Sequence, residues 1–168
     1  MIQRVGAILW AGLLLVLFCL PAAAGMAERL VGDWRLVSFV DTLENGERTY
    51  PYGRNPNGLF LYTRDGHVAI QIVKSPAPVF YGRRGADQAS LDQLRLEAKS
   101  YMAYFGTYTV EEARGVVVHH VLAGNNGYAG RDEERHVRLE GDRLVIFHEM
   151  STPKGVVKYE RVLERVKR

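Results

Sequence analysis

Residues 58–73 read GLFLYTRDGHVAIQIV and contain the clearest turn signal in the chain. Two short runs rich in apolar residues flank the dipeptide Asp65-Gly66. A type I′ hairpin turn needs positive φ at both central residues, and Asp-Gly tolerates that conformation. The stretch therefore predicts a β-hairpin with strands at 58–64 and 67–73, and Asn45-Gly46 predicts a second turn of the same kind.

Similar turns and short strands continue along the rest of the chain. Arg114-Gly115, Gly141-Asp142 and Lys154-Gly155 mark further turns. Between the turns we predict strands at 30–41, 47–52, 105–111, 115–122, 132–140, 143–150 and 155–165. An antiparallel meander of this length removes its exposed edges by closing on itself. We therefore predict an all-β fold, an antiparallel up-and-down barrel of about eight to nine strands.

One segment, 87–104, has helical rather than strand periodicity. Its apolar residues recur at spacings of three, four and seven, which predicts an amphipathic helix capped by Asp87 or by Ser90 with Gln93. A long irregular loop, 74–86, precedes it. Two roles remain open: a lid or plug at one barrel end, or a cover over an open seam in the sheet. The apolar residues are Leu91, Leu94, Ala98, Tyr101, Met102 and Phe105.

The first 24 residues have the pattern of a secretory signal peptide. Arg4 precedes an apolar run from Val5 to Leu20, and Pro21 and three alanines follow. We expect cleavage after Ala24, a mature domain at 25–168, and a periplasmic or secreted protein. The alternatives are an uncleaved membrane anchor, or translation from Met26, which would place the protein in the cytoplasm.

Composition narrows the class of protein further. The 168 residues are 47% hydrophobic and 24% charged, which suits one globular domain. The formal net charge is only +3, the charges alternate in sign along the C-terminal third, and no basic patch holds interleaved aromatics, so nucleic acid is excluded as a partner. The only cysteine, Cys19, lies in the leader, so the mature domain has no disulfide or thiolate metal site. We expect a monomer.

Strand alternation assigns inward-facing side chains. In the final two strands the more apolar faces carry one histidine and one arginine, His148 and Arg161, which we place inside. On 115–122 both faces are apolar, and His119 and His120 must point to opposite sides. We place His120 inside. The inward sets are Trp34, Leu36, Ser38 and Val40; Leu144, Ile146, His148 and Met150; and Val157, Tyr159, Arg161 and Leu163.

Several segments resemble a known family. Val31-Gly32-Asp33-Trp34 matches the Gly-x-Trp signature of lipocalins. The segments 30–39, 50–53, 104–108, 118–121, 139–144 and 159–162 resemble, in order, the bacterial and fungal lipocalin-like domain family over nearly all of 29–163. The resemblance implies a lipocalin-type antiparallel barrel, in a family most of whose members have no assigned activity. It also implies structural roles for Gly32, for Trp34 as a plug at one barrel end, and for Arg161 packed across the Trp34 ring.

Motifs that carry chemistry are few. The sequence has no Gly-x-Ser-x-Gly elbow, glycine-rich phosphate loop or His-Glu-x-x-His motif, and its five histidines follow no ligand spacing. We therefore assign no catalytic residue, metal or cofactor. Tyrosines gather around the second to fifth strands and the helix, and they favour a pocket that is mainly apolar with a few polar groups. The candidate ligand-binding residues are Ser38, Tyr62, Gln71, Tyr104, Tyr108, His120 and His148.

The sequence thus predicts an exported barrel that binds a small hydrophobic molecule. A packed interior is one alternative, because an eight-stranded barrel is just wide enough to be filled by side chains. Another is a small cofactor-independent enzyme, an isomerase, cyclase or hydratase, with His120 or His148 as general acid/base and Tyr62 or Tyr108 as hydroxyl donor. An enzyme requires a histidine and a second polar group at one point of the lumen.

Overall fold

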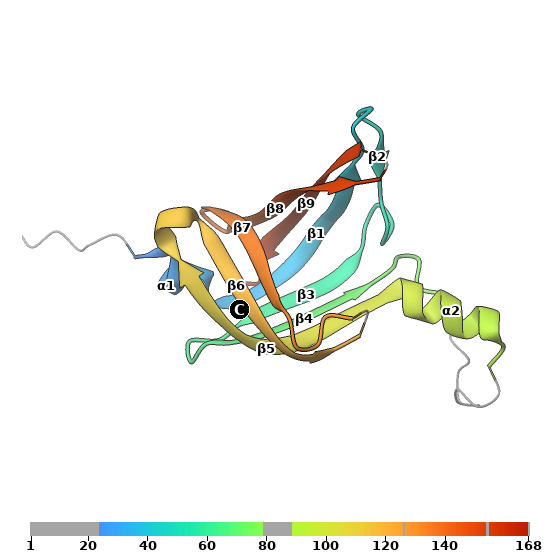
Figure 1. Cartoon of the computed structure of the whole chain (residues 1–168). Coiled ribbons are helices and arrows are strands. Elements are labelled where there is room, and N and C mark those ends of the chain that lie inside the picture. The colour runs from blue at the N-terminus through green and yellow to red at the C-terminus, as the bar shows by residue number, and fades with distance from the viewer. Residues whose placement is uncertain (1–23, 79–88, 126, 154, 168) are drawn as a thin grey trace, which may run out of the picture.

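The computed structural model describes residues 24–78, 89–125, 127–153 and 155–167, so the predicted signal peptide lies outside the described residues except for Ala24. In these described segments nine strands form one sheet, with two helices and one 3-10 turn (Figure 1). The strands are β1 (Gly32–Thr42), β2 (Arg48–Thr49), β3 (Asn57–Tyr62), β4 (His67–Val73), β5 (Tyr101–Glu111), β6 (Val116–Gly124), β7 (Asp132–Glu140), β8 (Arg143–Thr152) and β9 (Gly155–Arg165). The helices are α1 (Met26–Leu30) and α2 (Leu91–Ser100), and the 3-10 turn is η3 (Glu112–Arg114).

The sheet closes into a barrel. From β3 onward each strand pairs antiparallel with the next in the chain, and β1 pairs with both β3 and β9. β2 pairs only with the end of β1 and is an extra strand beside the eight that close the barrel. The predicted antiparallel up-and-down barrel is confirmed.

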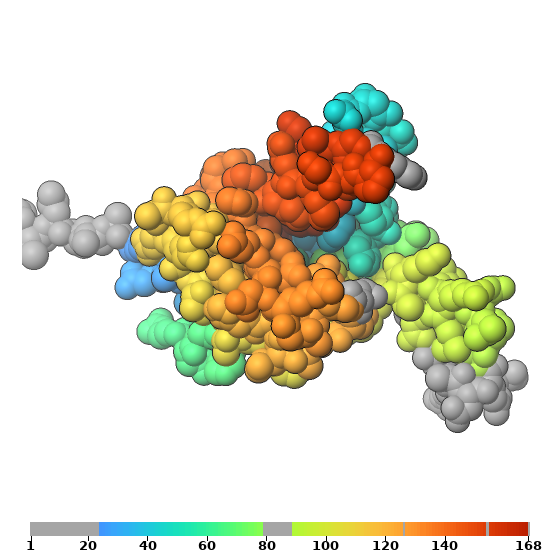
Figure 2. Space-filling model, in the orientation of Figure 1, coloured from blue at the N-terminus to red at the C-terminus, as the bar shows by residue number. Residues whose placement is uncertain are grey.

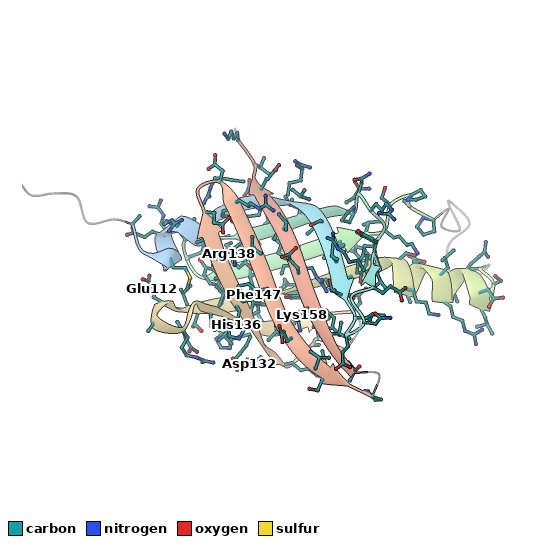
Figure 3. All side chains as sticks on the ribbon, turned by 90° about the horizontal axis from the view of Figure 1, so that it is seen from above. Glu112, Asp132, His136, Arg138, Phe147 and Lys158 are labelled. Carbon is teal, nitrogen blue, oxygen red and sulfur yellow. The ribbon has the colours of Figure 1, made fainter. Side chains whose placement is uncertain are left out.

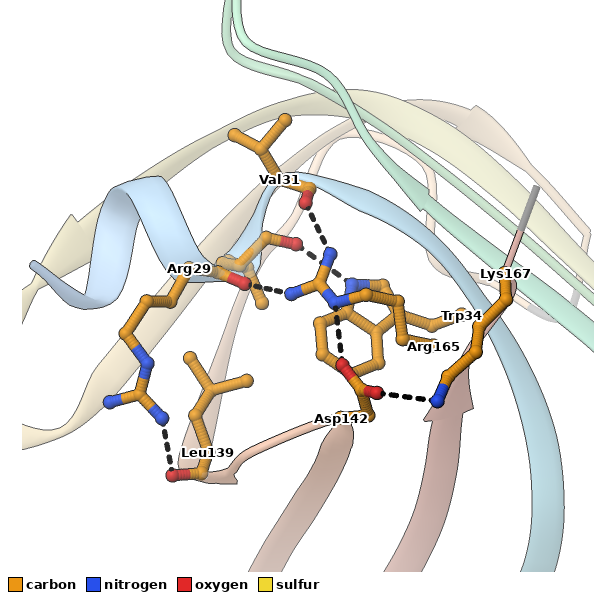
Figure 4. A network of polar contacts seen from close by, with 8 residues as sticks. Arg29, Val31, Trp34, Leu139, Asp142, Arg165 and Lys167 are labelled. Carbon is orange, nitrogen blue, oxygen red and sulfur yellow. Dashed lines mark hydrogen bonds and ion pairs between the residues drawn. The ribbon is translucent and has the colours of Figure 1, made fainter. Parts of the chain in front are cut away.

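Trp34 closes one end of the barrel, next to α1. Its ring is fully buried, and its indole N–H donates to the carbonyl of Leu30 at 2.8 Å. The guanidinium of Arg165 lies 4.2 Å above the ring, and donates to the carbonyl oxygens of Val31 and Arg29 (Figure 4). Asp142 lies at the edge of this network, where it contacts Arg165 and Lys167. The structure therefore has a packed end cap built from both chain termini of the domain.

Gly32 leaves the space that this cap needs. Its φ is +138°, a conformation that L side chains rarely adopt, and a Cβ there would lie 2.6 Å from Nη1 of Arg165. The glycine of the Gly-x-Trp motif thus admits the guanidinium above Trp34. Gly32 and Trp34 thus both contribute to the end cap.

The predicted packing of Arg161 on Trp34 is wrong. The β1–β9 register places Arg165 opposite Trp34 and Arg161 opposite Phe39. The Arg161 guanidinium lies 3.2 Å from the Phe39 ring centroid, in the barrel interior rather than at the closed end. Residue types alone could not separate these two arginines, because both lie on the same face of β9 and only the pairing register decides which one reaches Trp34.

A β-bulge in β1 reverses the predicted faces of its second half. The register shifts between Leu36 and Ser38, so one extra residue, Val37, is inserted into the alternation. Phe39 consequently joins the core, and Ser38 pairs with Val162 on the outer face. The prediction that Ser38 and Val40 face inward is wrong for this reason.

Two other inward assignments are also corrected. In β4 the β-branched residues Val68, Ile70 and Ile72 fill the core, which leaves Gln71 exposed on the outer face. In β6 His119 is fully buried, whereas His120 lies on the outer face. The inward sets predicted for β8 and β9 agree with the structure: Leu144, Ile146 and Leu163 are core residues, and His148, Met150, Tyr159 and Arg161 line the interior.

The helix α2 is shorter than predicted and lies outside the barrel. Ser90 and Gln93 form the predicted capping box, but residues 101–104 belong to β5. The helix continues β5 beyond the barrel end (Figures 1 and 2), and its Leu91 and Leu96 side chains are exposed. It is not a plug, and β1–β9 pairing leaves no open seam for it to cover. No helix among the described residues has the length and apolar character required to cross a membrane.

Candidate ligand-binding site

A cavity of about 420 Å³ occupies the half of the barrel away from Trp34. Figure 2 shows its mouth as a hollow between the β8–β9 hairpin and the loop before β7. Small-molecule sites commonly have volumes of roughly 300–1,000 Å³, so this cavity is large enough for one small ligand. Its apolar wall comes from six residues on five strands: Phe39, Phe60, Ile72, Met102, Ile146 and Met150.

Two partly buried ion pairs make the cavity less apolar than predicted. Arg135 of β7 contacts Glu133 at 2.9 Å, and Arg161 of β9 contacts Asp41 of β1 at 2.8 Å. Burial lowers the pKa of Arg161, although Asp41 opposes this shift. Arg131 also lines the cavity. The cavity and its two ion pairs therefore contain three guanidinium groups and two carboxylates. The site therefore carries a net positive charge.

His148 contributes a neutral imidazole to the same cavity. Its ring stacks on Tyr159 with centroids 4.5 Å apart and an interplanar angle of 11°. Burial lowers the pKa of His148, and the charges of Arg135 and Arg161 lower it further. The imidazole is consequently an available hydrogen-bond or proton acceptor near neutral pH.

Below the cavity floor, His119 connects two tyrosines. Its Nδ1 lies 2.9 Å from the Tyr104 hydroxyl and its Nε2 lies 3.0 Å from the Tyr62 hydroxyl. Burial lowers the pKa of His119 to about 3, with Arg135 and His120 contributing, so the ring is neutral. Burial also raises the pKa of Tyr104 to about 12 and that of Tyr62 well above its ordinary value. Tyr104 lines the cavity, so this buried chain reaches the ligand space at one point.

The predicted site residues divide into three groups. Tyr104 and His148 line the cavity, and Tyr62 lies one layer deeper, behind His119. Tyr108 is away from the cavity, where its hydroxyl donates to the Thr63 carbonyl at 2.8 Å and its ring packs edge-to-face on Tyr62. The outer face holds the other three, Ser38, Gln71 and His120, the last bonded to Thr109 and Asp132.

Besides Phe39 and Asp41, sequence reasoning missed five polar or aromatic residues that belong to the site. A signal was present for two of them, because Glu133 and Arg135 share the strand face of Val137 and Leu139, which is otherwise apolar. Charged residues on an apolar face are unusual unless paired. The missed residues are His119, Tyr128, Arg131, Glu133 and Arg135.

Within the described part of the chain, no group of three or more histidine, cysteine, aspartate or glutamate side chains lies close enough to hold a metal ion.

The family model for the lipocalin-like domain matches residues 31–160. The chain therefore belongs to the lipocalin-like domain family, and its barrel is of a kind suited to ligand binding. A comparison with curated proteins found no match.

Proposed function

We propose that this protein binds one small, mainly apolar molecule in the barrel cavity. The observation that carries the proposal is the cavity itself, which is open at one end and bounded at the other by the core above Trp34. Aliphatic and aromatic side chains supply apolar contact area, and the few polar groups supply orientation. A ligand enters from the hollowed end and lies between β1, β5 and β8.

A fluorescent probe tests this proposal. N-phenyl-1-naphthylamine is neutral and apolar, and we expect it to bind residues 25–168 saturably with one molecule per chain. Met150→Glu places a carboxylate at the cavity mouth and is expected to weaken binding about tenfold or more, the equivalent of about 1.4 kcal/mol. Met150 is half exposed, so the substitution is tolerable for folding.

The matched control is Phe147→Glu, three residues before Met150 on the same strand. Phe147 lies on the outer face beside His136 and Arg138 (Figure 3). This variant should bind the probe as the unaltered protein does. Absence of saturable binding, or equal loss in the two variants, would show that the cavity is not the site.

We further propose that the protein acts in the periplasm or outside the cell after loss of residues 1–24. The support is the charge, apolar run and small residues of the leader. Mass measurement of the protein from its host's periplasmic fraction is expected to give a chain that starts at Gly25. Recovery from the cytoplasm, or a mass that retains the leader, would contradict the export proposal.

Proton transfer on the bound molecule is a second candidate function. It is favoured by one observation: a neutral imidazole, His148, and a protonated phenol, Tyr104, line the same cavity. His120 is no longer a candidate base, because it lies outside the barrel. The molecule that co-purifies should then take up deuterium from heavy water with unaltered protein and not with His148→Gln. Equal uptake in both, or none in either, rejects this candidate.

A further inference from the structure

The hydrogen bonds of His119 determine where the Tyr104 hydroxyl proton points. A neutral imidazole carries one ring proton, so one nitrogen donates and the other accepts. The two tyrosines contact different nitrogens, Tyr62 at Nε2 and Tyr104 at Nδ1. The chain of three side chains therefore has two possible proton arrangements, and they give the Tyr104 hydroxyl opposite directions.

Tyr62 decides between the two arrangements. Its side chain is almost fully buried, and His119 Nε2 is its one hydrogen-bond partner among the described residues. If Nε2 carried the ring proton, the Tyr62 O–H would have no acceptor in the core, which is unfavourable for a buried donor. Tyr62 therefore donates to Nε2, and the ring proton lies on Nδ1.

The Tyr104 oxygen consequently accepts from His119. Nδ1–H donates to it at 2.9 Å, and Arg135 also lies within hydrogen-bonding reach of the same oxygen. Tyr104 therefore keeps its own O–H for another partner, and Tyr104 lines the cavity. Glu133, whose charge raises the pKa of Tyr104, is already paired with Arg135.

We propose that Tyr104 is a fixed hydrogen-bond donor at the cavity floor and that the ligand is an apolar carboxylic acid whose carboxylate it receives. This deepens the binding proposed above and rests on it. The charges agree, because Arg131, Arg135 and Arg161 line the same cavity and exceed the two carboxylates that pair with them. A carboxylate accepts several hydrogen bonds and donates none, so it is complementary to a cavity whose hydroxyl and guanidinium groups donate.

Isothermal titration tests the proposal with three apolar probes: a carboxylate, an amine and a neutral molecule. Octanoate is expected to bind at least about tenfold more tightly than octylamine. Tyr104→Phe should weaken octanoate about tenfold and leave N-phenyl-1-naphthylamine, which has no oxygen acceptor, unchanged. Tyr108→Phe is the matched control, because it removes a tyrosine hydroxyl away from the cavity. It should change neither affinity.

Tyr62 and His119 are positioning residues, and two readouts separate that role from packing. In histidine ¹⁵N spectra of the unaltered protein, His119 should be the tautomer with the proton on Nδ1. Tyr62→Phe, which does not alter the cavity lining, should weaken octanoate and spare N-phenyl-1-naphthylamine. These readouts also apply if Tyr104→Phe fails to fold.

The two proposals fail in different ways. If N-phenyl-1-naphthylamine does not bind at all, the binding function is wrong. If it binds but octanoate has no advantage over octylamine, or Tyr104→Phe leaves octanoate unchanged, only the carboxylate inference is wrong. An Nε2-protonated His119 would also overturn the proposed direction of the Tyr104 donor.

Discussion

Arg161 and Arg165 lie four residues apart on one face of β9 but make different contacts. Arg165 covers Trp34 at the closed end and donates to two backbone carbonyls, whereas Arg161 contacts Phe39 and pairs with Asp41 beside the cavity. Arg165 therefore connects the two ends of the domain, and Arg161 lines the ligand cavity. Substitutions at the two positions should therefore have separable effects.

Replacing Arg165 by methionine is expected to lower the free energy of unfolding by about 1–3 kcal/mol. The substitution removes the cation–π contact with Trp34. It also leaves backbone carbonyls without the charged donor that they accept from. Urea denaturation measures it, and binding of N-phenyl-1-naphthylamine to the folded variant should be unchanged. A stable variant with impaired probe binding would contradict the assignment of Arg165 to the closed end.

His119 should make the protein less stable in acid. Its folded pKa is about 3, below the ordinary value of 6.5, because burial disfavours the charged ring. Below pH 6.5 the unfolded chain takes up a proton that the folded protein does not, so stability falls as pH decreases from 6.5 toward 3. The slope for one such group is about 1.4 kcal/mol per pH unit.

Urea denaturation at pH 7 and pH 5 checks this expectation. The unaltered protein should lose more stability between these values than His119→Gln, which lacks the titrating group. His148→Gln serves as a comparison, since burial also lowers the pKa of His148 and its contribution has the same sign. Equal losses in the unaltered protein and His119→Gln would show that His119 is not buried in its neutral form.

Element by element, sequence alternation predicted most strands but not the faces of all of them. The hairpin around Asp65-Gly66, the strands β7 to β9 and the inward residues of β8 follow directly from turn chemistry and period-two alternation. In β1 an inserted residue reversed the alternation, and in β6 both faces are apolar, so period alone could not choose between His119 and His120. A bulge depends on pairing with β9, which is distant in sequence.

The capping box of helix α2 can be tested by a single substitution. Ser90→Ala removes the side-chain half of the capping box and should weaken the helix by about 1 kcal/mol. Because α2 lies outside the barrel, the thermal midpoint of the domain should stay unchanged while amide exchange within 91–100 accelerates. A fall in the midpoint comparable to that of a core substitution would show that the helix supports the barrel.

For the molecule as a whole, the sequence predicted the barrel but left open whether its interior is filled. Closure follows from many short strands with tight turns, a property of each segment of the chain. The volume left in the lumen depends on how side chains from different strands pack against one another. Phe39, Met102 and Ile146 meet only through the final register, so the cavity and its paired charges became visible only in the structure.

Native mass spectrometry of the mature protein from its own host is the decisive test of ligand binding in the barrel. We expect one small molecule bound per chain, released on denaturation and identified after extraction as an apolar carboxylic acid. Met150→Glu, expressed in the same host, should retain less of it than Phe147→Glu. A bare chain mass for the unaltered protein would show that the proposed ligand binding is wrong.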